Sequence, residues 1–271
     1  MFKKLLPEQY PLVRAVFNPL DHHLAIASIL EGNTLAPVYV DDPADPRAAF
    51  TWFHSRAFLV GSPENLGFSQ ALHAHIQYRL LPQLAADGQD AIILYASSSE
   101  WDPWAETLRP GKPPIHSVRQ YFRTLALTKN WRKVLLKGYT LCSVEEALAI
   151  QPPLQNLNWL MEEVVSERAS LDDFLQRSFG ICVIHEGTLV GWCLSEYNTN
   201  GRCEVGVATA EEHQRRGLGT AASLALVEEA FRRGFHEVGW HCWKRNTPSA
   251  ALAQKSGFQL VEEHNVIIIL I

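Results

Sequence analysis

The sequence predicts an α/β protein with a mixed, largely antiparallel central sheet flanked by helices. Three observations support this fold class. Short apolar and β-branched runs, typical of strands, alternate with longer segments in which apolar residues recur at helical spacing. Apolar residues make up 47% of the chain and charged residues 20%, which provides enough apolar surface for a core. At roughly 150 residues per domain, 271 residues give about 1.8 domains, so one large domain or two modest ones are expected.

The net charge is mildly negative. The chain has 24 Lys and Arg residues and 29 Asp and Glu residues, so it offers no general attraction to nucleic acid or to anionic lipid. No apolar run approaches the roughly 20 residues of a membrane helix, and Pro7 interrupts the short N-terminal apolar stretch. The five cysteines form no Cys-x-x-Cys pair, so reduced thiols are expected. We therefore predict a cytoplasmic protein, monomeric or homodimeric, that binds neither nucleic acid nor a membrane.

The first half of the chain is predicted to begin with strands. Three strand-like runs, separated by turn residues, cover residues 25–30, 36–40 and 48–59. A helix follows at residues 68–86, where leucine and isoleucine recur every three or four positions. The other expected elements are a buried strand at 91–96, a short helix at 101–108 and a strand at 118–127.

The second half shows clearer helix and strand boundaries. Ser143 with Glu146, and Ser170 with Asp173, form capping-box patterns that predict two helix starts. A hairpin is expected around the turn at residues 186–188. The elements predicted for this half are a helix at 157–166, strands at 181–185, 189–197 and 203–208, a helix at 218–233, a strand at 237–242, a helix at 248–256 and a doubly buried strand at 258–271.

A domain boundary is predicted near residues 129–138, which gives an N-terminal α/β domain at 1–135 and a C-terminal domain at 136–271. Both halves show the same order of hairpin, strand, loop, long helix, strand, short helix and strand. Glu31 precedes Arg47 by 16 residues (47 − 31), and Glu186 precedes Arg202 by 16 residues (202 − 186). These similarities fit a decayed repeat of one fold, and they fit chance or common α/β architecture equally well.

A glycine-containing turn between a strand and a helix carries the main chemical signal. The segment from Gln214 to Gly219 reads Q-R-R-G-L-G and fits the pattern Q/R-x-x-G-x-G/A. Free N–H groups at a helix start bind anions, and glycine allows close approach to a diphosphate. The alternatives are a glycine turn beside a solvated arginine pair, and an NAD site read from Gly217, Gly219 and Ala222 with Glu237 twenty residues beyond Gly217 (237 − 217). The eight intervening residues 209–216 disfavour NAD.

Together with a second block, this turn resembles the GNAT superfamily of N-acetyltransferases. The first block is CEVGVATAEEHQRRGLGTAASLALVEEAF, at residues 203–231. The second is WHCWKRNTPSAALAQKSGF, at residues 240–258, which repeats the superfamily spacing of Asn246, Ser249, Leu252, Gly257 and Phe258. The resemblance covers residues 181–258 firmly and 143–180 loosely, and says little about the first half.

The resemblance implies acetyl transfer from acetyl-CoA to a primary amine of a small-molecule or peptide acceptor, by direct attack. It implies that backbone groups of Val205 and Val207 pair with the pantetheine arm and that Asn246 contacts the cofactor. The pyrophosphate would be bound by the loop residues Gln214, Arg215, Arg216, Gly217, Leu218, Gly219 and Thr220.

Glu204 is the candidate base, with a solvent-facing strand carboxylate as the alternative interpretation. Glu196 and Tyr197 are the other candidates for this role. Glu211 and Glu212 are assigned to the cofactor loop, as is His213, which is expected to be solvated.

Two features depart from the superfamily pattern. Ala253 stands where many relatives have a tyrosine that protonates the departing thiolate. Only residues 259–271 follow the Gly-Phe pair, so one closing strand is expected to come from the first half. A CoA-binding regulatory pseudoenzyme is therefore the alternative function, with NAD binding as a third.

The first half shows no functional motif. Its corresponding loop, at residues 61–67, contains Glu64 and no arginine pair, so loss of cofactor binding is expected. No metal site is predicted, because His22-His23, His73 and His75 have no partners at metal-ligand spacing. Four tryptophans could line a cleft but are expected to serve in packing: Trp101, Trp104, Trp240 and Trp243.

Overall fold

The computed structural model describes all 271 residues and divides the chain into two compact units. Unit 1 comprises Met1–Arg119 and His264–Ile271, and unit 2 comprises Gln120–Glu263. The division therefore differs from the boundary predicted near residue 135, and the end of the chain belongs to the first unit. Two strands, β6 (Ile115–Thr124) and β12 (Gln259–Leu270), have residues in both units. No helix has both the length and the apolar character needed to cross a membrane.

Unit 1 is built on a mixed sheet with the strand order β1-β2-β3-β4-β5-β12. The strands β4 and β5 are parallel, and the other described neighbours are antiparallel. Its strands are β1 (Lys3–Lys4), β2 (Val38–Val40), β3 (Ala49–Phe53), β4 (Arg56–Val60) and β5 (Ala91–Ala96). Its helices are η1 (Pro7–Val13), η2 (Asn18–Leu20), α1 (Leu24–Leu30), α2 (Leu66–His75), η3 (Ile76–Leu80), α3 (Leu81–Ala86), η4 (Ser99–Trp101) and α4 (Asp102–Glu106).

Three expectations for the first half were wrong. Residues 25–30 form helix α1 rather than a strand; nearly all of its residues are buried, so no amphipathic period distinguished the two. Residues 48–59 form a hairpin that turns at His54, whose φ is +49°, rather than one strand. Glu31 and Gly32 end α1 and make no hairpin turn, so the shared 16-residue spacing does not mark equivalent positions.

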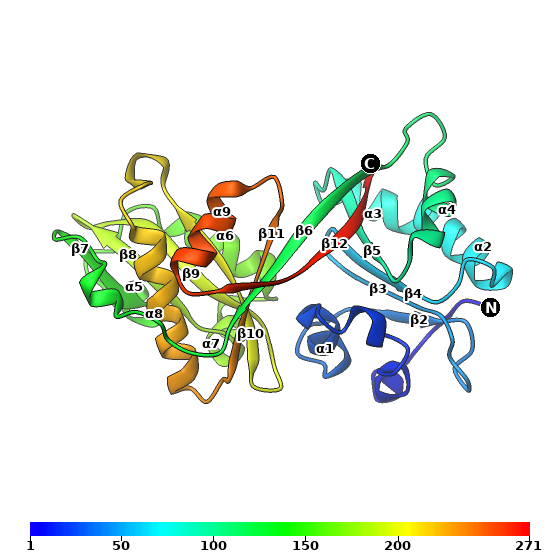
Figure 1. The fold of residues 1–271 in the computed structure, drawn as a ribbon, viewed down its shortest axis with the longest axis horizontal. Helices are drawn as coiled ribbons and strands as arrows, with labels where there is room; N and C mark the ends of the chain where they lie inside the picture. Colours follow the sequence, from blue (N-terminus) through cyan, green and yellow to red (C-terminus); the bar gives the residue numbers. More distant parts are fainter. The chain divides into compact units, whose positions relative to one another are not determined.

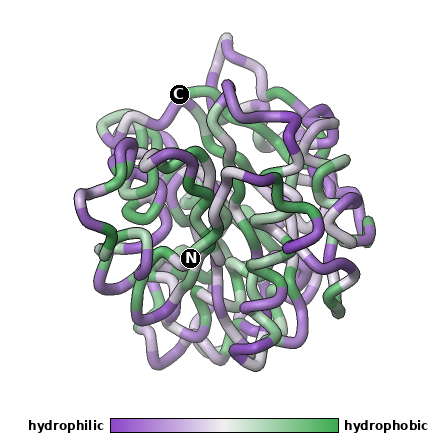
Figure 2. The backbone as a smooth tube through the Cα atoms, turned by 90° about the vertical axis from the view of Figure 1, so that its left-hand side faces the viewer, coloured by the Kyte–Doolittle hydropathy of each residue, from purple (hydrophilic) through white to green (hydrophobic).

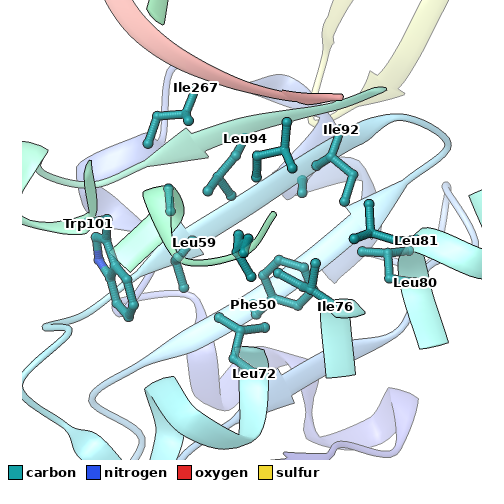
Figure 3. Close-up of a cluster of buried hydrophobic side chains, with 14 of the residues drawn as sticks. Phe50, Leu59, Leu72, Ile76, Leu80, Leu81, Ile92, Leu94, Trp101 and Ile267 are labelled. Carbon is teal, nitrogen blue, oxygen red and sulfur yellow. The ribbon is translucent and has the colours of Figure 1, made fainter. Parts of the chain in front are cut away.

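The helical segment at residues 66–86 covers the sheet of unit 1 and confirms the prediction made from its leucine spacing. Figure 3 shows Leu72, Ile76 and Leu80 from this segment beside Phe50 of β3, within a larger buried cluster. Trp101 lies at the edge of the same view and is fully buried. This tryptophan therefore serves in packing rather than in a cleft.

Unit 2 contains the strand order β6-β11-β10-β9-β8-β7, in which β10 and β11 are parallel. Its strands besides β6 are β7 (Tyr139–Ser143), β8 (Gly180–His185), β9 (Thr188–Thr199), β10 (Arg202–Thr209) and β11 (Glu237–Trp243). Its helices are η5 (Trp131–Lys133), α5 (Val144–Ala149), α6 (Leu157–Glu167), α7 (Leu171–Arg177), η6 (Glu211–His213), α8 (Leu218–Arg232) and α9 (Thr247–Lys255).

Helices cover both faces of this second sheet. In Figure 1, α8 lies in front of the strands and α6 behind them. The α8 face has a core that includes Val205, Leu226 and Trp240, and the α6 face has one that includes Trp192 and Leu194. Figure 2 shows hydrophilic segments in many of the peripheral loops and hydrophobic segments passing through the interior.

The predicted helix starts of unit 2 are confirmed, whereas the expectation for the last strand was wrong. The Glu146 N–H donates to Ser143 Oγ, and the Asp173 N–H donates to Ser170 Oγ, each at 3.1 Å. Strand β12 is not buried on both faces along its length. Its first five residues are exposed, and burial begins near Val266, because the polar first half carries Glu262 and Glu263.

Candidate active site

The parallel strands β10 and β11 diverge within the sheet of unit 2. Their pairing runs from Arg202 opposite Glu237 to Glu204 opposite Gly239, although both strands continue further. Because β10 stays paired with β9 as far as Thr209, β11 is the strand that departs. The backbone groups of residues 205–209 that face β11 are therefore not paired with it. They can accept an extended ligand as a strand would.

A cavity of about 610 Å³ adjoins the end of β10 and the starts of α8 and α9. Its wall contains residues 207–209 of β10 and residues 217–220 at the start of α8. The loop before α8 contributes His213, Gln214 and Arg215, and the region of α9 contributes Asn246, Pro248, Ser249, Ala251, Leu252 and Lys255.

The start of α8 presents N–H groups to this cavity. The Ala221 N–H donates to the Gly217 carbonyl at 3.0 Å, so the N–H groups of residues 218–220 precede the first repeating bond of the helix. Gly217 is the N-cap residue with a φ of +78°, and it has no side chain to cap these groups. A methyl group on Gly219 would lie 3.1 Å from Leu252 Cδ2, so glycine allows α8 to approach α9 closely. This geometry suits a phosphate group.

The two predicted arginines have different surroundings. Arg215 borders the cavity and has a φ of +59°. Arg216 does not border it; its guanidinium donates to Tyr139 Oη at 3.0 Å and to the Glu212 carbonyl at 2.9 Å. Lys255 at the end of α9 also lines the cavity. It was not predicted, because its position follows from the packing of α9 and not from a motif.

Tyr139 holds the loop before α8 in place. Its hydroxyl accepts the Arg216 bond and lies 2.9 Å from His213 Nδ1. The Tyr139 ring also stacks on His185, with centroids 4.4 Å apart. His213 is therefore half-buried and packed, in contrast to the solvated residue expected from the sequence.

The remaining predicted cofactor residues have distinct roles in the fold. Asn246 lines the cavity, and its Oδ1 accepts a bond from the Ser249 N–H at 3.2 Å at the start of α9. Val207 lines the cavity, whereas the side chain of Val205 is buried in the α8 core. Ala253 is fully buried in that core. An alanine side chain has no hydroxyl group that could protonate a thiolate.

Glu204 lies where β10 and β11 begin to diverge. Its neighbours Cys203 and Val205 pack toward α8, so strand alternation places the Glu204 side chain on the opposite face. The carboxylate is only 9% exposed, and its Oε1 lies 3.4 Å from His241 Nε2. The structure therefore shows a largely buried carboxylate and not the solvent-facing one considered as the alternative.

His241 and Tyr121 accompany Glu204 and were not predicted. Their rings stack with centroids 4.6 Å apart, and Tyr121 Oη donates to Glu237 Oε1 at 3.1 Å. His241 could have been found from strand alternation, because it lies two residues beyond Gly239, the partner of Glu204. No comparable signal connected Tyr121, which comes from β6.

The pKa of Tyr121 is raised by burial, and also by the nearby carboxylates of Glu204 and Glu237. Each of these effects disfavours the phenolate. Tyr121 therefore remains a neutral phenol that can donate a hydrogen bond.

An irregularity in β9 brings Glu196 to the same face. Thr199 pairs with Arg202 and Glu196 with Glu204, so β9 advances three residues while β10 advances two. Tyr197, within this bulge, has a φ of +51°. A methyl group on Gly206 would collide with the Glu196 carboxylate, which therefore lies over that glycine. Bulges commonly redirect side chains near active sites, and this one places the alternative candidate close to Glu204.

Comparison with known proteins agrees with this geometry. The chain matches the GNAT acetyltransferase family over residues 14–267. It belongs to this family and is an acyltransferase. The match includes most of unit 1, so the resemblance is not confined to the second half as the sequence motifs suggested.

Several relatives share the whole length of this GNAT acetyltransferase. An uncharacterized N-acetyltransferase, YdfB of Bacillus subtilis (strain 168), is 24% identical over 98% of both chains. A GCN5-related N-acetyltransferase-like protein from Streptococcus suis 89/1591 has a TM-score of 0.69 at 21% identity, covering 97% of this chain and 99% of that one. A tandem GNAT protein from the clavulanic acid biosynthesis pathway has a TM-score of 0.60 at 14% identity, covering 100% and 98%. The two structural matches show the shared fold.

Unit 1 of this GNAT acetyltransferase has the same order of elements as the region around the site. It lacks the early divergence of two parallel strands and the uncapped helix start. Strands β4 and β5 stay paired over four residues, up to Leu59 opposite Ala96, and β4 ends one residue later. The start of α2 is capped by Asn65, whose Oδ1 accepts from the Phe68 N–H at 3.3 Å. Trp101 Nε1 donates to the Gly61 carbonyl at 3.1 Å and ties the loop to the helical segment after β5. The helix start that could hold a phosphate is therefore already capped.

Proposed function

We propose that unit 2 binds acetyl-CoA and transfers the acetyl group to a primary amine of a small-molecule or peptide acceptor by direct attack. One observation carries this proposal. The uncapped start of α8 opens into a cavity at the end of β10, and Glu204 lies where β10 and β11 begin to diverge. A long ligand that carries a diphosphate and, at the end of an extended arm, a thioester fits this arrangement.

The binding step uses backbone groups and one cavity-lining cation of the loop. The N–H groups of residues 218–220 would bind the pyrophosphate, and Arg215 would add a charge-assisted bond. The pantetheine arm would pair with backbone groups of Val205 and Val207 along the edge of β10 that β11 leaves. Asn246 would contact the cofactor from the start of α9.

The chemical step requires a proton acceptor for the attacking amine. Glu204 would take this proton, directly or through a water, and His241 beside it would hold the carboxylate in position. The departing thiolate requires no tyrosine at position 253, because a thiol with a pKa near 8.5 is a tolerable leaving group. This arrangement distinguishes the proposed enzyme from one that depends on a dedicated acid.

The acceptor is expected to approach as a cation. Glu196 and Glu204 lie on the face of the sheet opposite α8, so their negative charges favour an ammonium group over a carboxylate. Unit 1 is proposed to bind no acetyl-CoA, because its corresponding helix start is capped by Asn65.

A ligand comparison followed by a product assay tests the proposal. Acetyl-CoA is expected to raise the thermal unfolding midpoint and NAD to leave it unchanged, since only a ligand that binds the folded state stabilises it. Incubation with acetyl-CoA and a panel of amines should then yield an acetylated amine detectable by mass spectrometry. Binding without transfer to any amine would support a CoA-binding pseudoenzyme, and stabilisation by NAD alone would overturn the assigned loop.

A further inference from the structure

Three histidines that are distant in the sequence come together in unit 1. His22 and His23 lie in the turn before α1, and His264 lies in β12, which returns to this unit at the end of the chain. The sequence predicted no metal partner for the His22-His23 pair. The fold provides one in His264. Because His264 lies 241 residues beyond His23 (264 − 23), no local spacing could reveal it.

The three imidazoles form a compact group. One ring nitrogen from each lies within 4.8 Å of the other two. The ring centroids are 4.1 Å apart for His22 and His23, 4.9 Å for His22 and His264, and 4.7 Å for His23 and His264. The rings are inclined at 48°, 44° and 85°, so they do not form a parallel stack. Their nitrogens can therefore converge on one point.

The surroundings hold the central imidazole in place. His23 is 5% exposed and packs against Phe58 and Tyr95, with ring centroids 5.3 Å and 4.3 Å away. His23 is also the N-cap residue of α1, yet its side chain makes no capping bond. Helix capping therefore does not account for the position of this imidazole.

We propose that His22, His23 and His264 bind one divalent transition-metal ion of the zinc class. Neutral imidazole is a preferred ligand of Zn²⁺, Co²⁺ and Ni²⁺, and three imidazoles with one further position is an established zinc geometry. The ligand atoms of a tetrahedral zinc site lie about 3.4 Å apart, from Zn–N distances of about 2.0–2.1 Å. Binding would draw the three nitrogens, which lie within 4.8 Å of one another, towards this spacing, chiefly by rotation of the less buried His22 and His264. The site is independent of the acetyl-CoA cavity, whose lining residues all belong to unit 2.

The ion would join two distant parts of the chain. It would connect the turn before α1 to β12, the strand that pairs with β5 through residues 267–270. Because such a site forms only when the chain is folded, metal binding contributes to folding stability. Zinc should therefore raise the thermal unfolding midpoint of the protein.

Metal titration of the full chain tests the proposal. Protein without an affinity tag, freed of metal by a chelator, is titrated with ZnCl2 against a chromophoric chelator. One zinc ion should bind per chain with a dissociation constant below about 1 µM. His23→Gln and His264→Gln should each weaken binding by about 100-fold or more, since each removes a ligand. His22→Gln, at a half-exposed position, serves as a third variant if either of the others fails to fold. Circular dichroism without metal checks that each variant is folded.

A matched control separates this site from other zinc-binding groups. His116 is an exposed histidine of unit 1 outside the cluster, so His116→Gln should bind zinc as the wild type does. Co²⁺ should give the visible absorption of a low-coordinate site in the wild type and not in His264→Gln. The proposal is overturned if the wild type binds no zinc in this range, or if the folded cluster variants retain wild-type affinity, as they would if zinc bound the carboxylates Glu163, Glu167 and Glu196.

Discussion

At the scale of single residues, the proposed base is a carboxylate whose surroundings come from neighbouring strands. Glu204 was predicted from its strand position, and the structure adds His241 at 3.4 Å and the stacked Tyr121. The sequence could propose Glu204 because the resemblance to the GNAT superfamily covers its strand. It could not identify Tyr121, because contact between β6 and β11 depends on the order of strands in the sheet.

Replacement of Glu204 tests its role as the base. Glu204→Gln should lower kcat by about 100-fold or more, the usual range for a lost general base, with little change in KM for acetyl-CoA. His241→Gln should lower kcat by a smaller factor, because it removes a positioning contact. Steady-state kinetics with an accepted amine measure both effects. The exposed turn variant Glu186→Gln should behave as the wild type, and wild-type turnover in Glu204→Gln would remove Glu204 from the mechanism.

Tyr121 should make stability depend on alkaline pH. Its pKa is raised in the folded state by burial and by Glu204 and Glu237, whereas in the unfolded chain it is about 10. Above pH ~10 the folded state then keeps a proton that the unfolded state loses. The contribution of Tyr121 to the free energy of unfolding is therefore complete below pH ~10 and is lost as pH rises further.

The measurement compares Tyr121→Phe with the wild type by chemical denaturation between pH ~8 and ~11. The wild type should lose free energy of unfolding more steeply above pH ~10, because phenylalanine has no proton to lose. Parallel curves for the two proteins would contradict the assigned environment of Tyr121.

At the scale of elements, the second half of the chain was predicted more fully than the first. The caps at Ser143 and Ser170 and the start of α8 are local signals, so their helices were confirmed. Helix α1 was mistaken for a strand, because a short segment buried nearly all round shows no period. The bulge in β9 also left no signal, since it depends on the pairing of two strands.

The loop before α8 contains two arginines with different surroundings. Arg215 borders the cavity, whereas Arg216 is bonded to Tyr139 and Glu212. Arg215→Gln should weaken acetyl-CoA binding by about 10- to 150-fold, because a charge-assisted bond to phosphate contributes roughly 1.5–3 kcal/mol. Arg216→Gln should have a smaller effect. Isothermal titration calorimetry measures both affinities, and a larger loss in Arg216→Gln would contradict the placement of these side chains.

At the scale of the whole molecule, the chain consists of two units, and the strands β6 and β12 have residues in both. The sequence predicted two halves and a strand contributed by the first half, but it placed the boundary near residue 135. The structure places it at Gln120 and returns residues 264–271 to unit 1. Local patterns could not show this arrangement, because β6 and β12 are continuous strands with residues in both units.

The proposed restriction of acetyl-CoA to unit 2 leads to a test on the core of unit 1. Trp101→Phe removes buried volume and the bond to the Gly61 carbonyl, so it should lower the free energy of unfolding by about 1–3 kcal/mol. The acetyl-CoA dissociation constant should not change. Denaturation and calorimetry on the same variant provide both values, and a large loss of acetyl-CoA affinity in a folded variant would contradict the assignment of binding to unit 2.

A crystal structure with bound acetyl-CoA tests the central claim most directly. The account predicts that the pyrophosphate contacts the N–H groups of residues 218–220 and that the thioester lies between β10 and β11 beside Glu204. A pyrophosphate bound away from the start of α8, or an acetyl group distant from Glu204, would contradict it.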